Sequence, residues 1–327
     1  MPRLFKLLKL ILMLAIITPS AALASVTSGT VKGVVVDDGG LPIPTVLITV
    51  SSENLMGIRS AETDVNGRFF IAELPPGIYE LVASKAGFTK KTYPKLGVNV
   101  GRNTILTIEL PLQESGEEMV IEETRPTIDT ESATRGSVLT KEFLDRIPAG
   151  RSYQQAVQMA AGVTGGANAN IGGASSNENT YMLDGVNITD PVTGTFSLNF
   201  NYDAIEQIEV LTSAFDPEYG YNLGGSINVV TRAGGNNLEV NTGVYYTNGN
   251  WAPKLDARYA ADGYELAPTD FDTQYEVIRA GSTVSGPIVR DKVWYIASYQ
   301  FTRSLISNVG IDLPRDFDGH YVFTKLT

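Results

Sequence analysis

The sequence predicts a mainly β protein with a smaller mixed α/β region in its middle. Short runs of β-branched residues separated by Gly, Pro and Asn–Gly turns fill the first third of the chain. Two short capped helical segments lie near residue 150, and alternating aromatic runs dominate the end. A length of 327 residues with 32 glycines and 15 tyrosines suits two or three β-rich domains.

Composition excludes several kinds of chemistry. The chain has no cysteine, which rules out a disulfide framework, a cysteine zinc site, an iron–sulfur cluster and a thiol nucleophile. The single histidine, His320, lies in what reads as a C-terminal loop and disfavours a multi-histidine metal centre or a histidine-based triad. The net charge of −11 argues against nucleic acid as a partner. We therefore expect no enzyme activity, no cofactor and no metal.

Residues 1–24 have the pattern of a secretory signal peptide. Arg3, Lys6 and Lys9 precede an apolar run over residues 10–17, and Ala22-Leu23-Ala24 follows as a small-residue cleavage site. The run is too short to span a bilayer, which takes about 20 helical residues. An N-terminal anchor helix or a buried helix is the alternative. Cleavage after Ala24 removes three cations and no acid, so the exported chain is more acidic.

Residues 28–112 predict a small β-sandwich. Residues 30–37, 44–50, 68–71, 78–82 and 103–110 favour strands, and DG, NG and PPG turns separate them. Asp64-x-Asn66-Gly67 resembles the start of a calcium loop, but Pro75 stands where such a loop needs glutamate. This tetrapeptide is therefore interpreted as a turn.

This segment resembles the carboxypeptidase regulatory-like domain, a seven-stranded transthyretin-like sandwich. The resemblance rests on Gly33-Val34-Val35, Pro42-x-Pro44, Thr63-Asp64-x-Asn66-Gly67-x-Phe69, Leu74-Pro75-x-Gly77-x-Tyr79 and Ala86-Gly87-Phe88. It implies a domain without catalytic residues of its own that heads a larger protein.

Residues 113–136 have the composition of a linker. An acidic stretch surrounds a short apolar patch, Met119-Val120-Ile121, and a polar run follows. Composition alone favours a solvated tether. A short extended segment between domains can instead add as a strand to the sheet edge of a partner, with backbone hydrogen bonds supplying the affinity.

Residues 137–235 predict a mixed α/β domain. Helices are expected over residues 140–144 and 152–161, strands over 181–183, 205–211 and 226–231, and a Gly/Asn-rich loop over 165–179. Neither a phosphate-binding P-loop nor a G-x-S-x-G elbow occurs in this stretch.

Three acidic side chains of this domain raise the question of glycoside chemistry. Glu206 and Glu209 lie three apart on a predicted strand and so on opposite faces, and Asp216 follows in a loop. The two glutamates are therefore not preset as a catalytic pair. We expect solvated or salt-bridged carboxylates.

The same domain is similar to the plug domain of TonB-dependent outer-membrane receptors. The resemblance rests on Leu183–Val186, Ile205–Val210, Tyr219-Gly220 and Gly224–Arg232, although the family usually has arginine where Gln207 stands. The plug-motif residues it implies are Asp184, Gly185, Glu206, Glu209, Tyr219, Gly220, Gly224, Gly225 and Asn228.

The resemblance also implies a TonB box just before the plug, at residues Glu117, Glu118, Met119, Val120, Ile121 and Glu122. Residues 147–151, 158–163 and 284–292 resemble the Oar-like branch of these receptors more than the SusC-like glycan importers.

Residues 236–327 predict the first strands of an outer-membrane β-barrel. Residues 239–247 and 293–302 alternate regularly, whereas Arg279 disturbs the alternation of residues 273–285. The segment has room for about four or five spanning strands, but a membrane barrel needs at least about eight. The last predicted strand, residues 321–327, reaches the end of the sequence, so we expect an incomplete barrel from a longer receptor.

These resemblances imply energised uptake or export across the outer membrane, with TonB and outer-membrane lipid as partners and an unknown solute or protein as cargo. The sandwich and plug would lie on the periplasmic side. Polar residues of the 165–179 loop are candidates to face a ligand: Asn168, Asn170, Ser175, Asn177 and Asn179. Residues 190–199 are similar in character. A periplasmic or surface adhesion protein without a pore is the alternative, and a secreted hydrolase is disfavoured by the missing cysteine and lone histidine.

Overall fold

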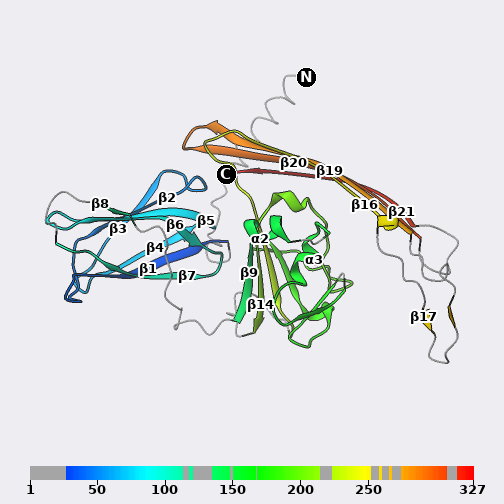
Figure 1. Ribbon diagram of the computed structural model, residues 1–327, viewed down its shortest axis with the longest axis horizontal. Helices are drawn as coiled ribbons and strands as arrows, with labels where there is room; N and C mark the ends of the chain where they lie inside the picture. Colours follow the sequence, from blue (N-terminus) through cyan, green and yellow to red (C-terminus); the bar gives the residue numbers. More distant parts are fainter. Residues whose placement is uncertain are drawn as a thin grey trace, which may run out of the picture.

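Three β-rich parts follow one another along the chain (Figure 1). The computed structural model describes residues 27–112, 118–120, 135–147, 150–166, 168–213, 223–251, 258–259, 265–266, 274–307 and 315–327. A sandwich lies beside a central α/β domain, and a long curved sheet passes over the α/β domain. The predicted signal peptide, residues 1–24, lies outside the described residues.

The first part is a sandwich of two sheets. One sheet has the order β4-β1-β7, and the other has the order β3-β2-β5-β6-β8. The strands are β1 (Gly29–Val36), β2 (Leu47–Ser51), β3 (Ile58–Glu62), β4 (Arg68–Leu74), β5 (Gly77–Ser84), β6 (Lys90–Val98), β7 (Asn103–Glu109) and β8 (Glu118–Val120). Alternating side chains from both sheets, such as Val35, Ile48, Leu81 and Ile108, are fully buried between them.

The Asp64 turn is confirmed as a turn. Asp64 Oδ1 accepts hydrogen bonds from the amides of Asn66 and Arg68, both at 2.8 Å. Strands β3 and β6 were not predicted. In β6 three lysines and Pro94 hide the alternation, and the register against β5 shifts near Pro94, where a proline can be accommodated.

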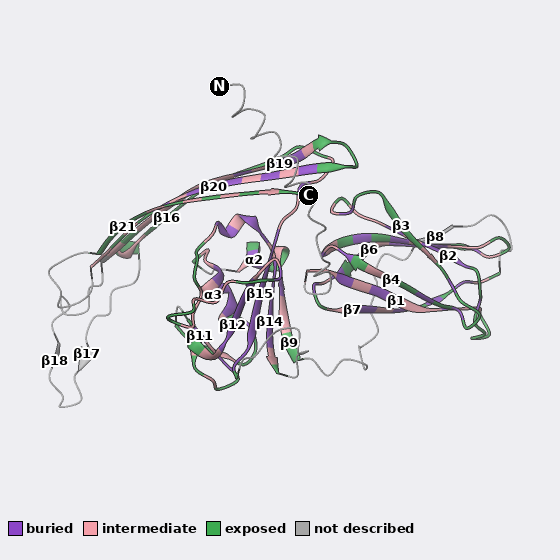
Figure 2. Cartoon of the chain, turned by 180° about the vertical axis from the view of Figure 1, so that it is seen from behind, coloured by how far each residue is buried: buried purple, intermediate pink, exposed green. Residues whose placement is uncertain are grey.

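The second part is a five-stranded sheet of order β13-β12-β15-β14-β9 with two short helices (Figure 2). The elements are β9 (Arg135–Thr140), α2 (Lys141–Arg146), α3 (Tyr153–Val157), β10 (Val163–Gly165), β11 (Ala169–Ile171), β12 (Thr180–Leu183), β13 (Val186–Asn187), β14 (Ile205–Ser213) and β15 (Ser226–Thr231), with single 3₁₀ turns at Ser176–Glu178 and Tyr202–Ala204. Thr140 and Ser152 cap the two helices as predicted, but α3 ends well before residue 161. No helix in the described ranges is long and apolar enough to cross a bilayer.

Every residue of β15 is buried, and so are six of the nine residues of β14. The sheet therefore forms the centre of this domain, and helices α2 and α3 pack against it with Leu144, Ala156 and Val157.

The third part is an antiparallel sheet of order β16-β19-β20-β21. The strands are β16 (Glu239–Asn248), β19 (Gln274–Val289), β20 (Val293–Ser307) and β21 (Arg315–Leu326), and the separate pair β17 (Arg258–Tyr259) and β18 (Glu265–Leu266) lies in the connection after a 3₁₀ turn at Gly249–Trp251. His320 lies inside β21 and not in a loop, with Nδ1 at 2.8 Å from the Tyr299 hydroxyl.

The two faces of this sheet differ in polarity. On β20 the buried positions are Trp294, Ile296, Ser298, Gln300 and Thr302, and the alternate positions include the exposed Tyr299. The exposed set of the sheet also contains Val240, Val244, Val322 and Leu326. The alternation predicted from the sequence is thus present, with a largely polar inner face and an apolar outer face, as in transmembrane β-strands.

Candidate functional site

The three parts meet around a cleft of about 430 Å³. Asn54, Pro75 and Pro76 line it from the sandwich. The central domain contributes Asp184, Glu206 and Thr231, and strand β21 contributes Lys325. Asp184 and Lys325 of this lining also join the central domain to the curved sheet, and relative movement of the two parts has to break that contact.

Asp184 links the central sheet to β21. Its carboxylate accepts from the Thr231 amide at 2.8 Å and from the Thr231 hydroxyl at 2.5 Å. Lys325 Nζ completes the group at 3.1 Å from Asp184 Oδ2. Asp184 has a φ of +47°, and Gly185 follows at +77°. The DG turn after β12 therefore aims the carboxylate at the end of β15 and at the curved sheet.

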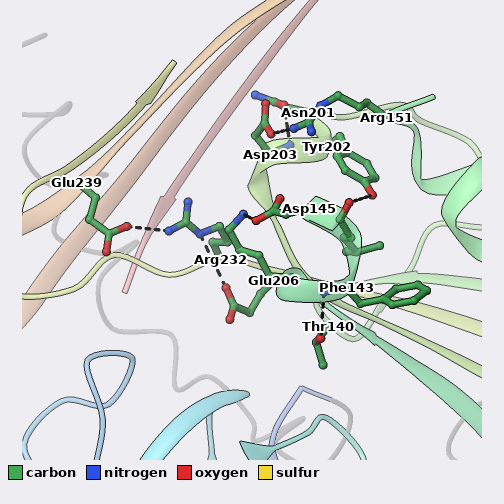
Figure 3. Close-up of polar contacts among 12 residues, drawn as sticks. Thr140, Phe143, Asp145, Arg151, Asn201, Tyr202, Asp203, Glu206, Arg232 and Glu239 are labelled. Carbon is green, nitrogen blue, oxygen red and sulfur yellow. Dashed lines mark hydrogen bonds and ion pairs between the residues drawn. The ribbon is translucent and has the colours of Figure 1, made fainter. Parts of the chain in front are cut away.

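Arg232 makes a second link, just after β15 (Figure 3). Its guanidinium lies 2.8 Å from Glu239 on β16 and 3.8 Å from Glu206 on β14. Burial raises the pKa of Glu206, and Arg232 opposes that shift. The β14 register shifts between Ile205 and Gln207, so Glu206 is the extra residue of a bulge.

Gln207 joins the central domain to the sandwich. Its Oε1 accepts from the Val100 amide at 3.1 Å, and its Nε2 donates to Asn99 Oδ1 at 3.1 Å. Both sandwich residues lie in the turn between β6 and β7. A carboxamide can accept and donate at once, which arginine cannot, so the departure from arginine at this position matches the contact it makes.

Glu209 is fully buried at the same contact. Arg102 Nε lies 3.8 Å from its Oε1, and the backbone of Gly101 packs against the carboxylate. Burial raises the pKa of Glu209 to about 7, and Arg102 and Asn228 partly oppose this shift. Of the two expected states, solvated or salt-bridged, Glu209 has the second, because the sandwich covers the sheet at this point and brings Arg102 to the carboxylate.

We expect Gln207→Ala to loosen the sandwich contact. The variant loses two hydrogen bonds, one of them to a buried amide, at a cost of about 1.4 kcal/mol. This cost raises the equilibrium constant for local opening of the contact about tenfold. Hydrogen exchange at the Val100 amide is the measurement, with about tenfold less protection expected. Gln154→Ala is the control, because Gln154 Nε2 donates to Asn199 within the central domain. Unchanged protection of Val100 in Gln207→Ala would contradict the assignment.

The predicted ligand-facing residues do not form one group. Asn168, Ser175 and Asn177 are exposed and Asn170 is half-buried. In the chain they lie in or close to β11, which is on the side of the central domain away from the sandwich (Figure 2). Asn179 is buried: its Nδ2 donates to the Ala169 carbonyl at 2.7 Å and its Oδ1 accepts from the Gly225 amide at 2.9 Å. Asn179 therefore supports the sheet and does not face a ligand.

A second cleft, of about 550 Å³, lies between the central domain and the curved sheet and was not predicted. It is lined mainly by amide, hydroxyl and guanidinium groups, among them Gln154, Gln158, Arg279 and Arg151. Arg151 pairs with Asp203 (Figure 3), and its guanidinium carbon lies 4.1 Å from the Tyr245 ring centre. Nothing in the local pattern around Arg151 marks it, because its partners are about 50 and 90 residues away.

The predicted TonB box is partly described. Glu118, Met119 and Val120 form β8, which pairs in parallel with β6 of the sandwich. Glu117, Ile121 and Glu122 lie outside the described residues, and so do Tyr219 and Gly220. Within the described ranges, no three Asp, Glu or His side chains gather to hold a metal ion.

Two family models match the chain. Residues 30–111 match the carboxypeptidase regulatory-like domain, and residues 129–227 match the TonB-dependent receptor plug domain. The chain carries the plug of a TonB-dependent receptor. The central domain is hereafter the plug, and the curved sheet is the barrel sheet. The predicted fold class, a sandwich followed by a plug and barrel strands, is confirmed.

The chain is similar to the TonB-dependent transporter Oar of Myxococcus xanthus, with 32% identity over 306 residues. That alignment covers 88% of this chain and 28% of the relative, so the chain spans little more than a quarter of the relative's length. Among solved structures, the outer-membrane transporter YddB of Escherichia coli is 15% identical with a TM-score of 0.46, covering 58% of this chain and 30% of that one. The siderophore receptor PirA of Acinetobacter baumannii is 22% identical with a TM-score of 0.40, covering 52% and 24%.

Proposed function

We propose that this chain belongs to an Oar-like transporter that moves a solute or protein across the outer membrane. TonB pairs with the segment around Val120 and, using the energy of the inner membrane, pulls on the plug. The observation that carries the proposal is a plug fastened to the polar face of a sheet whose other face is apolar.

The contacts between the plug and the barrel sheet suit a plug that can move. Polar and ionic contacts join it to the barrel sheet: Lys325 to Asp184, Arg232 to Glu239, and Asn201 Nδ2 to Ser298 Oγ. Such contacts exchange readily with water, so they can break and re-form at a modest net cost. A continuous apolar interface would not release in this way.

The chain order puts the pulling point next to the plug edge. Strand β9, the first element after the linker, is an edge strand of the plug sheet and pairs with β14. Tension on the segment around Val120 therefore reaches β9 first. Removing an edge strand breaks one ladder of hydrogen bonds, whereas removing a central strand breaks two.

The turns of the barrel sheet support one orientation in the membrane. The tight turn at Arg290–Lys292, between β19 and β20, lies at the sandwich end of the barrel sheet (Figure 1). The long connection that contains β17 leaves the opposite end. Outer-membrane barrels have short periplasmic turns and long extracellular loops, which supports a periplasmic sandwich. Cargo would then meet the plug from the far side, where Asn168, Asn177 and the Arg151 cleft are candidate contacts.

Movement of a plug needs binding and mechanical work and no catalytic group, so we propose that the receptor has no enzyme activity and needs no cofactor.

Site-specific cross-linking tests it, because the chain has no cysteine of its own. Val120→Cys, placed in the complete gene, should cross-link to a cysteine-bearing TonB in cells. Val65→Cys is the control, since Val65 is 82% exposed in the turn between β3 and β4 and does not belong to the segment. We expect a cross-linked product for Val120→Cys alone, in a heat-modifiable outer-membrane band.

A product found in the periplasm or the medium, with no TonB adduct at either position, would favour the adhesion protein without a pore.

A further inference from the structure

Strand β6 has two partners along the same few residues. On one side it pairs antiparallel with β5, where Lys91 and Thr92 oppose Ala83 and Val82. On the other side Lys90, Lys91 and Thr92 pair in parallel with Glu118, Met119 and Val120. Among the described strands, β8 is the last one on that side of the sheet.

We propose that the β6 edge of the sandwich is a dock for the TonB-box segment, and that TonB has to displace this segment from the dock before it can bind. The inference rests on the proposed function for the identity of the competing partner. The pairing of β8 with β6 does not depend on it.

The dock fits a strand because β6 offers a backbone edge. Unpaired amides and carbonyls at a sheet edge readily accept another extended chain. A segment that binds by backbone pairing cannot pair with two strands along the same edge of its own backbone. If β6 and a strand-adding protein use the same backbone edge of residues 118–120, only one of them can therefore be paired with it at a time.

Charge favours this occupant. The β6 end of the dock carries two successive lysines, Lys90 and Lys91, and the docked segment comes from an acidic stretch that includes Glu117, Glu118, Glu122 and Glu123. The Lys91 ammonium lies 3.0 Å from the Glu109 carbonyl, and burial lowers the pKa of Lys91 while Glu109 opposes the shift. Lys90 is exposed and opposes Glu118 in the register, which makes a cross-strand pair of opposite charges.

The burial of successive β6 residues also supports a dock at this part of the strand. Lys91, Thr92 and Tyr93 are successive buried residues, although one face of a sandwich sheet normally meets solvent. Three consecutive buried positions show that β6 is covered more completely here than alternation alone would give. This covered stretch includes two of the three residues that pair with β8.

The dock would hold the segment weakly. Three residue pairs supply only a few hydrogen bonds, each worth about 1 kcal/mol net. The segment is then docked most of the time and open for a small fraction of it. The apparent affinity for TonB equals the affinity for the open segment multiplied by that open fraction. The sandwich therefore sets how readily TonB engages the receptor.

Residues 1–327 contain no cysteine, so introduced pairs can be tested directly against the unaltered receptor. Lys90→Cys with Glu118→Cys joins partner residues of the two strands, whereas Lys95→Cys with Glu118→Cys is the matched control. Lys95 is exposed on the same strand but lies five residues away, roughly 16 Å along it, too far for a disulfide. Both double variants are made in the complete receptor and oxidised, and free thiols are counted.

Binding of the periplasmic domain of TonB from the same cells is then measured before and after reduction. We expect a disulfide in the Lys90–Glu118 pair alone, binding at least about tenfold weaker in the oxidised form, and recovery on reduction. As a second variant, Lys90→Glu should tighten binding about threefold by weakening the dock, while Lys95→Glu should leave it unchanged.

Free thiols in the Lys90–Glu118 pair after oxidation would overturn the dock. A disulfide with equal TonB binding in both forms would overturn the competition. A disulfide with no TonB binding to any form, the unaltered receptor included, would overturn the TonB-box assignment and the competition with it, while the strand pairing would stand.

Discussion

Gly225→Val is expected to destabilise the plug by about 3 kcal/mol, the upper part of the range for overpacking. A Cβ at this position would lie 2.4 Å from Ile171 Cγ2 and 2.6 Å from the Leu211 carbonyl oxygen. One neighbour is a core side chain and the other is backbone, so neither can move away cheaply. The Gly225 amide and carbonyl are also bonded, to Asn179 Oδ1 and the Thr180 amide.

Hydrogen exchange of peptides from β14 and β15 measures this effect. A loss of about 3 kcal/mol corresponds to exchange faster by about a hundredfold for amides that open with the whole plug. Gly166→Ala is the control, because a Cβ there meets nothing within 4 Å and the residue has no positive φ. Equal protection in Gly225→Val and Gly166→Ala would show that the close approach is not maintained in solution.

The second large effect is a pH dependence that arises at Glu209. Its pKa rises from 4.5 to about 7 in the folded chain, mainly because burial disfavours the charged form. The stability that this group contributes is therefore fully present below pH 4.5. It decreases as the pH rises towards 7 and is lost above that value, a difference of about 3 kcal/mol.

Glu209→Gln should remove this dependence. Relative to the unaltered chain, the variant should be more stable at pH 8 by up to about 3 kcal/mol and nearly equal at pH 4.5, by urea unfolding. Arg102 loses this ion pair but is 26% exposed and can be hydrated. Glu142→Gln, an exposed residue of α2, is the control and should give a flat difference. A flat difference for Glu209→Gln as well would mean that the carboxylate is not desolvated.

Within single elements, the sequence predicted the fold well. β-branched runs, DG and NG turns and the Thr140 and Ser152 caps act over a few residues, and the strands and helix starts lie close to the predicted positions. Strand β6 was missed because lysines and a proline obscure its period, and the packing of Tyr93, Leu96 and Val98 stabilises it. Helix α3 is shorter than predicted, because the turn that follows it begins only a few residues after the Ser152 cap.

The candidate site was predictable only in part. The resemblance to the plug family marks Asp184, Glu206, Glu209 and Gly225, through the DG turn, the strand with the two glutamates and the Gly-Gly run. Asn179 shares its Asn/Gly-rich loop with Asn168 and Asn177, yet it is buried where they are exposed. Composition is the same for all three, and only the position of the loop relative to β15 separates them.

By itself the sequence determined the order of the parts, their fold class and the absence of thiol chemistry, because these depend on residue type and short-range spacing. Only the tertiary structure decided which polar groups hold the three parts together. These are the ion pair of Lys325 with Asp184, the hydrogen bond from the Val100 amide to Gln207, and the packing of Gly101 against the Glu209 carboxylate. These partners are about 100 to 140 residues apart. Their pairing depends on how the sandwich, plug and barrel sheet pack together, which no local pattern encodes.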